Sequence, residues 1–423
     1  MQLTDTLERD FKTEFDRLLN GSGEGPVALA VSGGGDSMAL LVLAAGWAQE
    51  RRRSLSVVSV DHGLRPEAAD EIALVKNLCD RLGLRHAVLR WSGWDGTGNL
   101  QDQARQARKR LIGAWAAENG IAVVATGHTL DDQAETFLIR LARGSGVDGL
   151  SAMFDSEVFN DIRWIRPLLS VSRADLRSYL QAKGIGWADD PSNLDPTYAR
   201  VKFRMAAEQL AALGLDAKTL AGTAARMQRA RHALELATRD LAAGAARATD
   251  IGTVRLDRKV FLAAPEELQL RLLSHAIGWV SRQDYRPRLE PLQQALAAIA
   301  AGRNATLGGC IIVTGETALI EVCREPNAVQ PSTDLTAPFD NRWQVRCDAA
   351  TGPGLALRAL GDDGLQQCPG WRDSGYSRWA LMGSPSVWQK DELIAAPFAV
   401  TSRTCEVNLL PRPQSFLTSI LKH

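Results

Sequence analysis

The stretch that most constrains the fold runs through residues 27–37 and reads VALAVSGGGDS. Five apolar residues compatible with a strand lead directly into a glycine-rich turn, and a helical pattern follows at once, to about residue 47. A strand, a glycine turn and a helix start in this order turn several free backbone N–H groups toward one point. The positive end of the helix dipole lies behind them, and glycine lets the backbone approach a ligand closely. The stretch therefore predicts an anion site, for example for a phosphate chain.

This turn differs from the Walker-type phosphate loop, because GxxxxGK[ST] is absent and no lysine stands at its end. Asp36 stands there instead, and its carboxylate would repel phosphate unless a hard cation such as Mg²⁺ lay between them. A glycine-rich turn without a ligand is the structural alternative. The candidate anion-binding residues are Ser32, Gly33, Gly34, Gly35, Asp36 and Ser37.

Strand patterns alternate with helical patterns through the first half of the chain. The expected strands cover residues 27–31, 55–60, 86–91, 121–125 and 161–166, and Ser172 is expected to cap a later helix. Such alternation predicts βαβ units, and hence a parallel sheet with helices on both faces. Ligands bind such sheets outside the carboxyl ends of the strands. We therefore expect the loops at 32–37, 61–64 and 126–132 to converge on one crevice.

The second half of the chain has a different character. Helix is expected over residues 197–248, with a break at 213–215, and over 256–301, followed by short strands at 310–313 and 319–323. Residues 326–338 have the composition of a linker, and the remainder shows short β-like runs. Since 423 residues exceed what one core usually serves, we predict three domains. These are an α/β domain at 1–213, a mainly helical domain at 214–330 and a small β-rich domain at 331–423.

Composition limits the class of protein and its compartment. No stretch approaches the roughly 20 apolar residues of a membrane span, and the N-terminus does not have the pattern of a signal peptide. The cysteines are scattered without a CxxC pair, which argues against an iron–sulfur cluster, a zinc site and a disulfide scaffold. We therefore expect a cytoplasmic protein. The net charge is zero, but the arginines cluster locally and could bind RNA phosphates; a solvated helix face is the alternative.

A second dense motif, TGHTLDDQAET, covers residues 126–136. His128 ends a predicted strand, and the carboxylates of Asp131, Asp132 and Glu135 follow at spacings that place neighbours on one helix face. Carboxylates there could hold Mg²⁺ or the amine of a cationic substrate. Acids in a first helical turn can also simply complement the helix dipole.

Together these motifs resemble a known family. SGGGDS resembles the pyrophosphatase loop of the N-type ATP pyrophosphatases (the PP-loop, or adenine nucleotide alpha hydrolase-like, fold), which split ATP between the α and β phosphates. Synthetases of GMP, NAD and asparagine and several tRNA thiolases share that loop. The ordered set SGGGDS, VDHGL, ARQAR, GHTLDDQAET, ARGSG and DPSNLDPTYAR is more specific and resembles the tRNA(Ile)-lysidine synthetases. LDRKVFLAAP, and ATLGGCIIV followed by CRE, resemble that family's tRNA-binding portion, so the resemblance covers about residues 25–325.

The resemblance implies a two-step ligation on the isoleucine tRNA with a CAU anticodon. The C2 carbonyl oxygen of the wobble cytidine attacks the α-phosphate of ATP, and pyrophosphate leaves. The ε-amine of free L-lysine then attacks C2 and expels AMP, which leaves lysidine and changes codon reading from AUG to AUA. ATP and Mg²⁺ are thus the implied co-substrate and cofactor, no membrane is involved, and a homodimer is compatible with the family.

Residue roles follow from the resemblance by position. Loop residues 32–37, together with Val60, His62 and His128, would bind ATP, with Asp36 as Mg²⁺ ligand. Arg108 and Arg200 could steady the adenylate. Asp132 and Glu135 would bind lysine, and the implied catalytic residues are Asp36, Asp132, Glu135 and Arg200. The expected tRNA contacts are Arg226, Arg229, Arg286 and Arg288.

Three positions depart from the family pattern. Thr129 stands where many members have a second His, Lys109 replaces a frequent Tyr, and Val201 replaces a frequent Asn. Two other functions are considered beside the ligase. A tRNA thiolase of the same superfamily commonly uses paired cysteines or a cluster, whereas Cys79 stands alone in a helical pattern. A non-enzymatic ATP-binding module would leave the acidic helix and the long arginine-bearing second half without a role.

Overall fold

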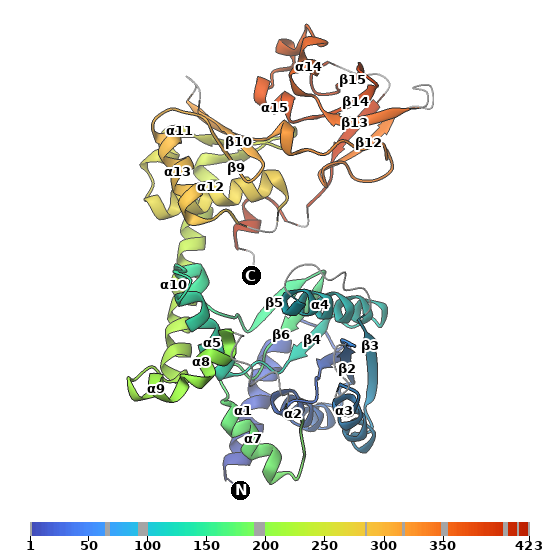
Figure 1. The fold of residues 1–423 in the computed structure, drawn as a ribbon, viewed down its shortest axis with the longest axis vertical. Coiled ribbons are helices and arrows are strands. Elements are labelled where there is room, and N and C mark those ends of the chain that lie inside the picture. Colours follow the sequence, from blue (N-terminus) through green and yellow to red (C-terminus); the bar gives the residue numbers. More distant parts are fainter. Residues whose placement is uncertain are drawn as a thin grey trace. The chain divides into compact units, whose positions relative to one another are not determined.

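The computed structural model describes residues 2–63, 68–91, 100–189, 199–283, 286–314, 318–347, 354–400, 405–412 and 414–421 (Figure 1). The chain divides into two compact units, Met1–Arg231 and His232–Lys422. The division falls inside helix α10 (Ala217–Ala245), whereas the sequence suggested a boundary at residue 213. Residues 232–330 and 331–422 share one compact unit, so the three-domain scheme stays a prediction.

The first unit is built on a mainly parallel sheet. Its strands are β1 (Val27–Ala30), β2 (Leu55–Asp61), β3 (Arg85–Arg90), β4 (Val123–Thr126), β5 (Ser156–Phe159) and β6 (Ile162–Ile165). They lie in the order β3-β2-β1-β4-β6-β5, and all pairings are parallel except that of β5 with β6. The predicted α/β fold is confirmed. The antiparallel edge strand β5 was missed, because its sequence SEVF lacks an apolar run and Val158 is exposed.

Helices cover both faces of this sheet. The helices of the first unit before α10 are α1 (Gln2–Leu19), α2 (Gly35–Arg51), α3 (Ala68–Leu82), α4 (Leu100–Glu118), α5 (Leu130–Leu141), α6 (Val147–Leu150), α7 (Arg173–Ala182), α8 (Ala199–Met205) and α9 (Ala207–Ala212). Because successive strand residues point to opposite faces, Val27 and Leu29 join a core with Trp47 of α2. Ala28, between them, joins the other core with Ile112 of α4. Strand β1 is thus buried on both sides, which explains its continuous apolar run.

The order of strands creates a switch point at β1. Strand β2 lies on one side of β1 and β4 on the other, so the loops that follow β1 and β4 leave the sheet side by side. This is where parallel α/β sheets bind ligands. Strand β6 is parallel to β4, so the segment leading into α7 leaves at the same edge.

The second unit contains a five-stranded sheet in the order β7-β8-β11-β10-β9. Its strands are β7 (Ala246–Ala248), β8 (Val254–Asp257), β9 (Ala305–Leu307), β10 (Cys310–Val313) and β11 (Leu319–Arg324), and its helices are α11 (Arg258–Ala263), α12 (Glu266–Ser281) and α13 (Leu289–Ala300). The predicted strands at 310–313 and 319–323 are confirmed. The helix expected from residue 256 begins instead at Arg258, because the buried Val254 and Leu256 belong to β8.

The end of the chain adds two small sheets, as predicted for a β-rich module. Strand β12 (Trp343–Cys347) pairs with β16 (Cys405–Leu409), and β13 (Leu355–Ala359), β14 (Pro385–Gln389) and β15 (Glu392–Ala395) form the other sheet. Short helices α14 (Gly361–Gln366) and α15 (Arg378–Met382) accompany them. Across the described residues, no helix combines the length and apolar character that crossing a bilayer requires.

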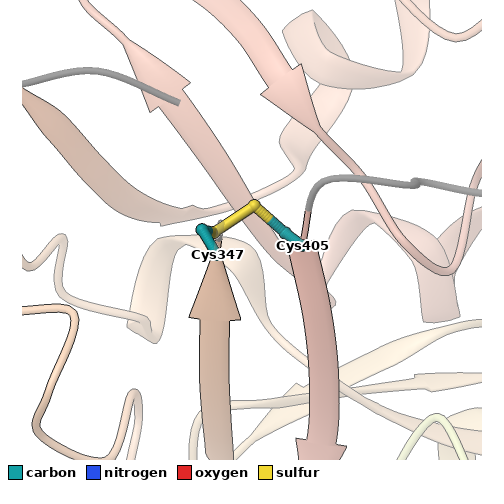
Figure 2. The surroundings of a disulfide bond; sticks show 2 residues. All are labelled: Cys347 and Cys405. Carbon is teal, nitrogen blue, oxygen red and sulfur yellow. A yellow bond between two sulfur atoms is a disulfide. The ribbon is translucent and has the colours of Figure 1, made fainter. Parts of the chain in front are cut away.

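A disulfide bond joins Cys347 and Cys405, contrary to the expectation from the sequence (Figure 2). The two residues are directly paired across β12 and β16, with their Cα atoms 4.1 Å apart. They are separated by 58 residues in the sequence, so cysteine spacing could not indicate the pairing. The other cysteines, Cys79, Cys310, Cys323 and Cys368, are buried and free.

Candidate functional site

The glycine turn after β1 forms the expected anion-binding geometry. Helix α2 begins at Gly35, and its N-cap Gly34 offers no side-chain acceptor, so the first-turn N–H groups are available to a ligand. Gly33 has φ +90°, and a Cβ there would meet Glu71 at 3.1 Å. The hydroxyl of Ser37 accepts from the N–H of Ser32 at 3.1 Å and donates to the Gly34 carbonyl at 2.9 Å. This internal bonding holds the turn in shape without using the helix-start amides.

The loop after β4 packs directly against that turn. A Cβ on Gly127 would lie 3.0 Å from backbone atoms of Asp36, so glycine is required for this approach. Thr129 caps α5: its hydroxyl accepts from the Asp132 N–H, and the Asp132 Oδ2 accepts from the Thr129 N–H at 2.9 Å. This capping box fixes Asp132 at the start of α5, beside the phosphate turn.

Arg173, the first residue of α7, connects the acidic residues. Its Nε lies 3.2 Å from Asp36 Oδ2, its Nη2 3.4 Å from Asp132 Oδ1 and its Nη1 3.3 Å from Glu135 Oε1. Its backbone N–H donates to Asp131 Oδ2 at 2.8 Å. The predicted convergence of Asp36, Asp132 and Glu135 is therefore observed, and Arg173, which was not among the predicted site residues, lies between them.

Helix α8 brings further guanidinium groups to the same acids. Arg204 contacts Glu135 Oε1 at 3.0 Å, and Arg200 lies 4.0 Å from Asp132 Oδ1. Burial acts to raise the pKa of Asp132, but the charges of Arg173 and Arg200 and the hydrogen bond from the Thr129 N–H outweigh it and hold that pKa below its ordinary value. Burial raises the pKa of Asp36 above its ordinary value, and Arg173 only partly offsets this rise.

Two buried carboxylate oxygens in this cluster have no hydrogen-bond partner among the described residues: Asp36 Oδ1 and Glu135 Oε2. A buried unpaired carboxylate oxygen is costly unless a ligand completes it. Mg²⁺ usually takes one or two carboxylates together with waters and substrate phosphates, so Asp36 Oδ1 beside the phosphate turn fits such an ion. No group of three or more potential metal ligands was found in the described parts of the chain. A metal here would therefore depend on phosphate oxygens.

A group of arginines lies around His128. The pKa of Arg108 lies below its ordinary value because of desolvation and because Arg105 and Arg200 repel it, although its side chain still reaches the surface. Desolvation and the charges of Arg200 and Arg166 likewise lower the pKa of Arg105. Like charges held together this way favour an anionic ligand. Burial holds the pKa of His128 far below its usual value, so its ring is neutral at pH 7.

The remaining predicted nucleotide residues lie at the same edge of the sheet. Val60 is in β2, and His62 follows it, edge-on to Trp91 with ring centroids 5.6 Å apart. Two parts of the predicted motifs lie outside the described residues, at 64–67 and 190–198. The first range contains the last residue of VDHGL, and the second contains most of DPSNLDPTYAR. Just before the second gap, the Ala188 N–H donates to the Gly33 carbonyl at 3.0 Å, so this segment reaches the phosphate turn.

The three departures from the family pattern have structural partners. Thr129 is the cap described above. Lys109 pairs with Glu157 at 2.9 Å and lies over the ring of Phe159 at 4.4 Å. Val201 is buried, with 5% of its surface exposed, so an apolar residue suits that position.

The predicted tRNA contacts are not part of this cluster. Arg226 and Arg229 are exposed on α10 in the first unit, whereas Arg286 and Arg288 are exposed ahead of α13 in the second. Arg173 and Arg204 are the residues that sequence reasoning missed. The signal for Arg173 was available: it follows the predicted cap Ser172 at the end of another parallel strand, and such ends share one edge.

Comparisons with known proteins show which family this chain resembles. A family profile described as a PP-loop domain matches residues 7–210. A tRNA(Ile)-lysidine synthase from Ruegeria pomeroyi is 45% identical over 408 residues, covering 94% of each chain. A protein of the same name from Wolbachia pipientis wMel is 36% identical, covering 90% of this chain and 91% of its own. One from Bradyrhizobium sp. is 42% identical, covering 73% and 90%.

Likeness to solved structures is much weaker. The U34-tRNA thiolase NcsA from Methanococcus maripaludis aligns with 17% identity and a TM-score of 0.45, covering 52% of this chain and 78% of its own. Similarity at this level carries no argument about function.

Proposed function

This chain belongs to the tRNA(Ile)-lysidine synthase family, and we propose that its ligase reaction takes place where the turn after β1 meets the acidic start of α5. It is an ATP-dependent tRNA-modifying ligase that joins lysine to C2 of the wobble cytidine in the CAU-anticodon isoleucine tRNA, through an adenylated cytidine. The observation that carries the proposed location is the set of three carboxylates around Arg173, next to free helix-start amides.

The phosphate turn performs the first step in this proposal. The N–H groups of residues 35–37 bind the phosphates that leave as pyrophosphate, and they stabilise the charge that develops there. Asp36 Oδ1 offers one oxygen to Mg²⁺, which, when bound, neutralises phosphate charge. The neutral ring of His128 lies near Arg200, which together with Arg108 receives the adenylate phosphate.

The acidic start of α5 performs the second step. Glu135 and Asp132 bind the lysine substrate, and Glu135 Oε2 is the uncommitted acceptor. The ε-amine has an ordinary pKa near 10.4, so deprotonating it at pH 7 costs about 4–5 kcal/mol. A carboxylate within reach can take the proton once attack on C2 has begun to acidify the nitrogen. The target cytidine must also leave its stack in the anticodon loop to reach this site.

Partners and location complete the proposal. Free L-lysine, ATP with Mg²⁺ and the isoleucine tRNA are the substrates, and Arg226, Arg229, Arg286 and Arg288 contact tRNA phosphates. We place the protein in the cytoplasm, where these substrates occur together. We also propose that two copies of this chain form a homodimer.

Mass spectrometry of an isoleucine tRNA transcript incubated with ATP and lysine tests the reaction directly. The expected product carries lysidine at the wobble position, with AMP and pyrophosphate released in equal amounts. Asp36→Ala should abolish pyrophosphate release while circular dichroism shows a folded chain. ADP and inorganic phosphate as the main products would reject the assignment of the turn.

A further inference from the structure

The disulfide between Cys347 and Cys405 attaches strand β16 covalently to β12 (Figure 2). These two strands form a two-stranded sheet, and of the five residues of β16 only Cys405 is buried, with 4% of its surface exposed. A two-stranded sheet is marginally stable on its own. Because β16 buries so little surface, the covalent bond is a main restraint on its position.

The four other cysteines are poor candidates for thiol chemistry, because all of them are buried. Burial raises the pKa of the Cys79 thiol to about 11 and that of the Cys310 thiol to about 12. It also raises the pKa values of Cys323 and Cys368. Since the thiolate is the reactive form, these four thiols stay protonated and unreactive at pH 7. Exchange with small thiols is thus confined to the paired cysteines of β12 and β16.

The segment that follows β16 holds two arginines of the second unit in place. The Leu410 carbonyl accepts from Arg282 Nη2 at 2.6 Å. Arg412 Nη2 donates to the Trp279 carbonyl, and its guanidinium lies 3.8 Å from the centroid of the Trp279 ring. Arg282 follows α12 directly, and Arg286, a proposed tRNA contact, comes shortly after it. The positions of Arg282 and Arg412 therefore depend on where β16 holds this segment.

We propose that Cys347 and Cys405 form a thiol–disulfide switch that fixes β16 against β12 when oxidised and releases it when reduced. The oxidised state holds Arg282 and Arg412 in the arrangement described above, near a proposed tRNA contact. The effect on tRNA rests on the proposed function, whereas the change at β16 can be measured without any substrate. A switch of this kind suits the cytoplasm, because disulfides of cytosolic proteins are usually transient and redox-sensing.

A small thiol such as glutathione reduces the pair in two exchange steps. Its thiolate attacks the sulfur of Cys347, which is half-buried, whereas Cys405 is almost fully buried. The S–S bond breaks, Cys405 leaves as a thiolate and takes up a proton, and a mixed disulfide stays on Cys347. A second glutathione thiolate attacks the glutathione sulfur of that mixed disulfide and releases Cys347, which is also protonated. The protein gains two electrons and two protons, glutathione disulfide is the oxidised product, and oxidation reverses these steps.

The direct test equilibrates the full chain in glutathione buffers from fully reduced to fully oxidised, without ATP, lysine or tRNA. Free thiols are then alkylated under denaturing conditions and assigned by peptide mass spectrometry. Cys347 and Cys405 should pass together from disulfide to alkylated thiols as the buffer becomes reducing, whereas the other four cysteines should be alkylated at every ratio. Hydrogen exchange of residues 405–412 should be at least about tenfold faster in the reduced chain.

Two variants connect this response to the cysteine pair. The double variant Cys347→Ser with Cys405→Ser should show the fast exchange in both reducing and oxidising buffers. Cys368→Ala is the matched control: it removes a buried free thiol of the same unit and should keep the native response to the buffer. A disulfide that never forms, one that resists full reduction, or equal exchange of residues 405–412 in both states of the native chain would overturn the switch.

Binding of the isoleucine tRNA measures the consequence for the substrate. The oxidised chain should bind it at least about threefold more tightly than the reduced chain. ATP affinity should be the same in both states, because the phosphate turn belongs to the first unit. Equal tRNA affinity in both states would overturn the effect on tRNA. None of these results bears on whether the chain forms lysidine, so the two proposals can fail separately.

Discussion

At the scale of single residues, Asp36 and Glu135 share one guanidinium but should serve different half-reactions. Glu135→Gln keeps the size of the side chain and removes its charge. The loss of a charge-assisted contact of about 1.5–3 kcal/mol should raise the KM for lysine roughly ten- to a hundredfold. Pyrophosphate release from tRNA and ATP without lysine should stay near native. The measurement is a comparison of this adenylation rate with the lysine dependence of the full reaction.

Asp36→Asn is the reciprocal variant. It should slow pyrophosphate release, because it weakens the Mg²⁺ position, and change the KM for lysine little. Equal effects of both variants on both half-reactions would contradict a division of the cluster into two ligand positions.

Gly127 gives a second residue-level prediction, this time about backbone packing. In Gly127→Ala, the new Cβ would press on backbone atoms of Asp36 and Ser37 at 3.0 Å. Overpacking of this kind costs about 1–3 kcal/mol and here should displace the phosphate turn, so ATP affinity should fall. Isothermal titration calorimetry with a non-hydrolysable ATP analogue measures this affinity. Gly113→Ala on α4, where a Cβ meets nothing within 4 Å, should bind the analogue as the native chain does.

At the scale of elements, His275 couples α12 to the short helix Thr418–Leu421. Its Nε2 donates to the Phe416 carbonyl at 3.0 Å, and burial lowers its pKa to about 4. The unfolded chain takes up a proton near pH 6.5 while the folded chain does not, so stability is full above that pH and falls as pH decreases toward 4. The loss should reach about 2 kcal/mol at pH 5.

Hydrogen exchange of α12 and residues 414–421 measures this effect, after correction for the intrinsic pH dependence of exchange. His275→Gln keeps an N–H donor without the titration, so its local stability should change much less between pH 7 and pH 5. An equally large loss in the variant would assign the pH dependence to other groups.

The elements also show what a sequence can and cannot predict. Strand β1 and the phosphate turn were predictable, because a doubly buried strand is continuously apolar and the turn needs glycine at Gly33. Strand β5 was not, because an exposed edge strand carries no burial pattern. The acids of the site were predictable from helical spacing, whereas the contacts of Arg173 depend on the position of α7 against α5. The pairing of Cys347 with Cys405 likewise depends on strand register.

At the scale of the whole molecule, α10 belongs to the architecture of both units. Leu220 packs with Phe137 of α5 in one apolar cluster, and the Gln228 Nε2 donates to the Met153 carbonyl at 2.8 Å. A fragment ending at residue 213 would therefore expose the apolar face of α5, the helix that carries Asp132 and Glu135. Any catalytic fragment must extend to Arg231, and recognition of tRNA is better examined in the full chain.

The exposed arginines allow that examination, because they lie in both units. Replacing Arg226 and Arg229 by glutamine alters the first unit only, and replacing Arg286 and Arg288 alters the second. Each lost phosphate contact should reduce the slope of log tRNA affinity against log salt by roughly 0.7–0.9, so each pair should reduce it by up to about 1.8. ATP affinity should not change. Arg239→Gln, which loses only a contact with the adjacent Asp240 on α10, should keep the native slope.

A variant that lacks both arginine pairs tests whether one tRNA contacts both units at once. If one tRNA contacts both units at once, the four-residue variant should lose the sum of the two slope changes. It should also discriminate less well between the isoleucine tRNA and a methionine tRNA with the same anticodon, because the catalytic site meets mainly the displaced base. Filter binding over a range of salt, with both tRNAs, measures slope and selectivity together. If either pair left the slope at its native value, those arginines would make no phosphate contact, and the tRNA would have to be recognised by other residues.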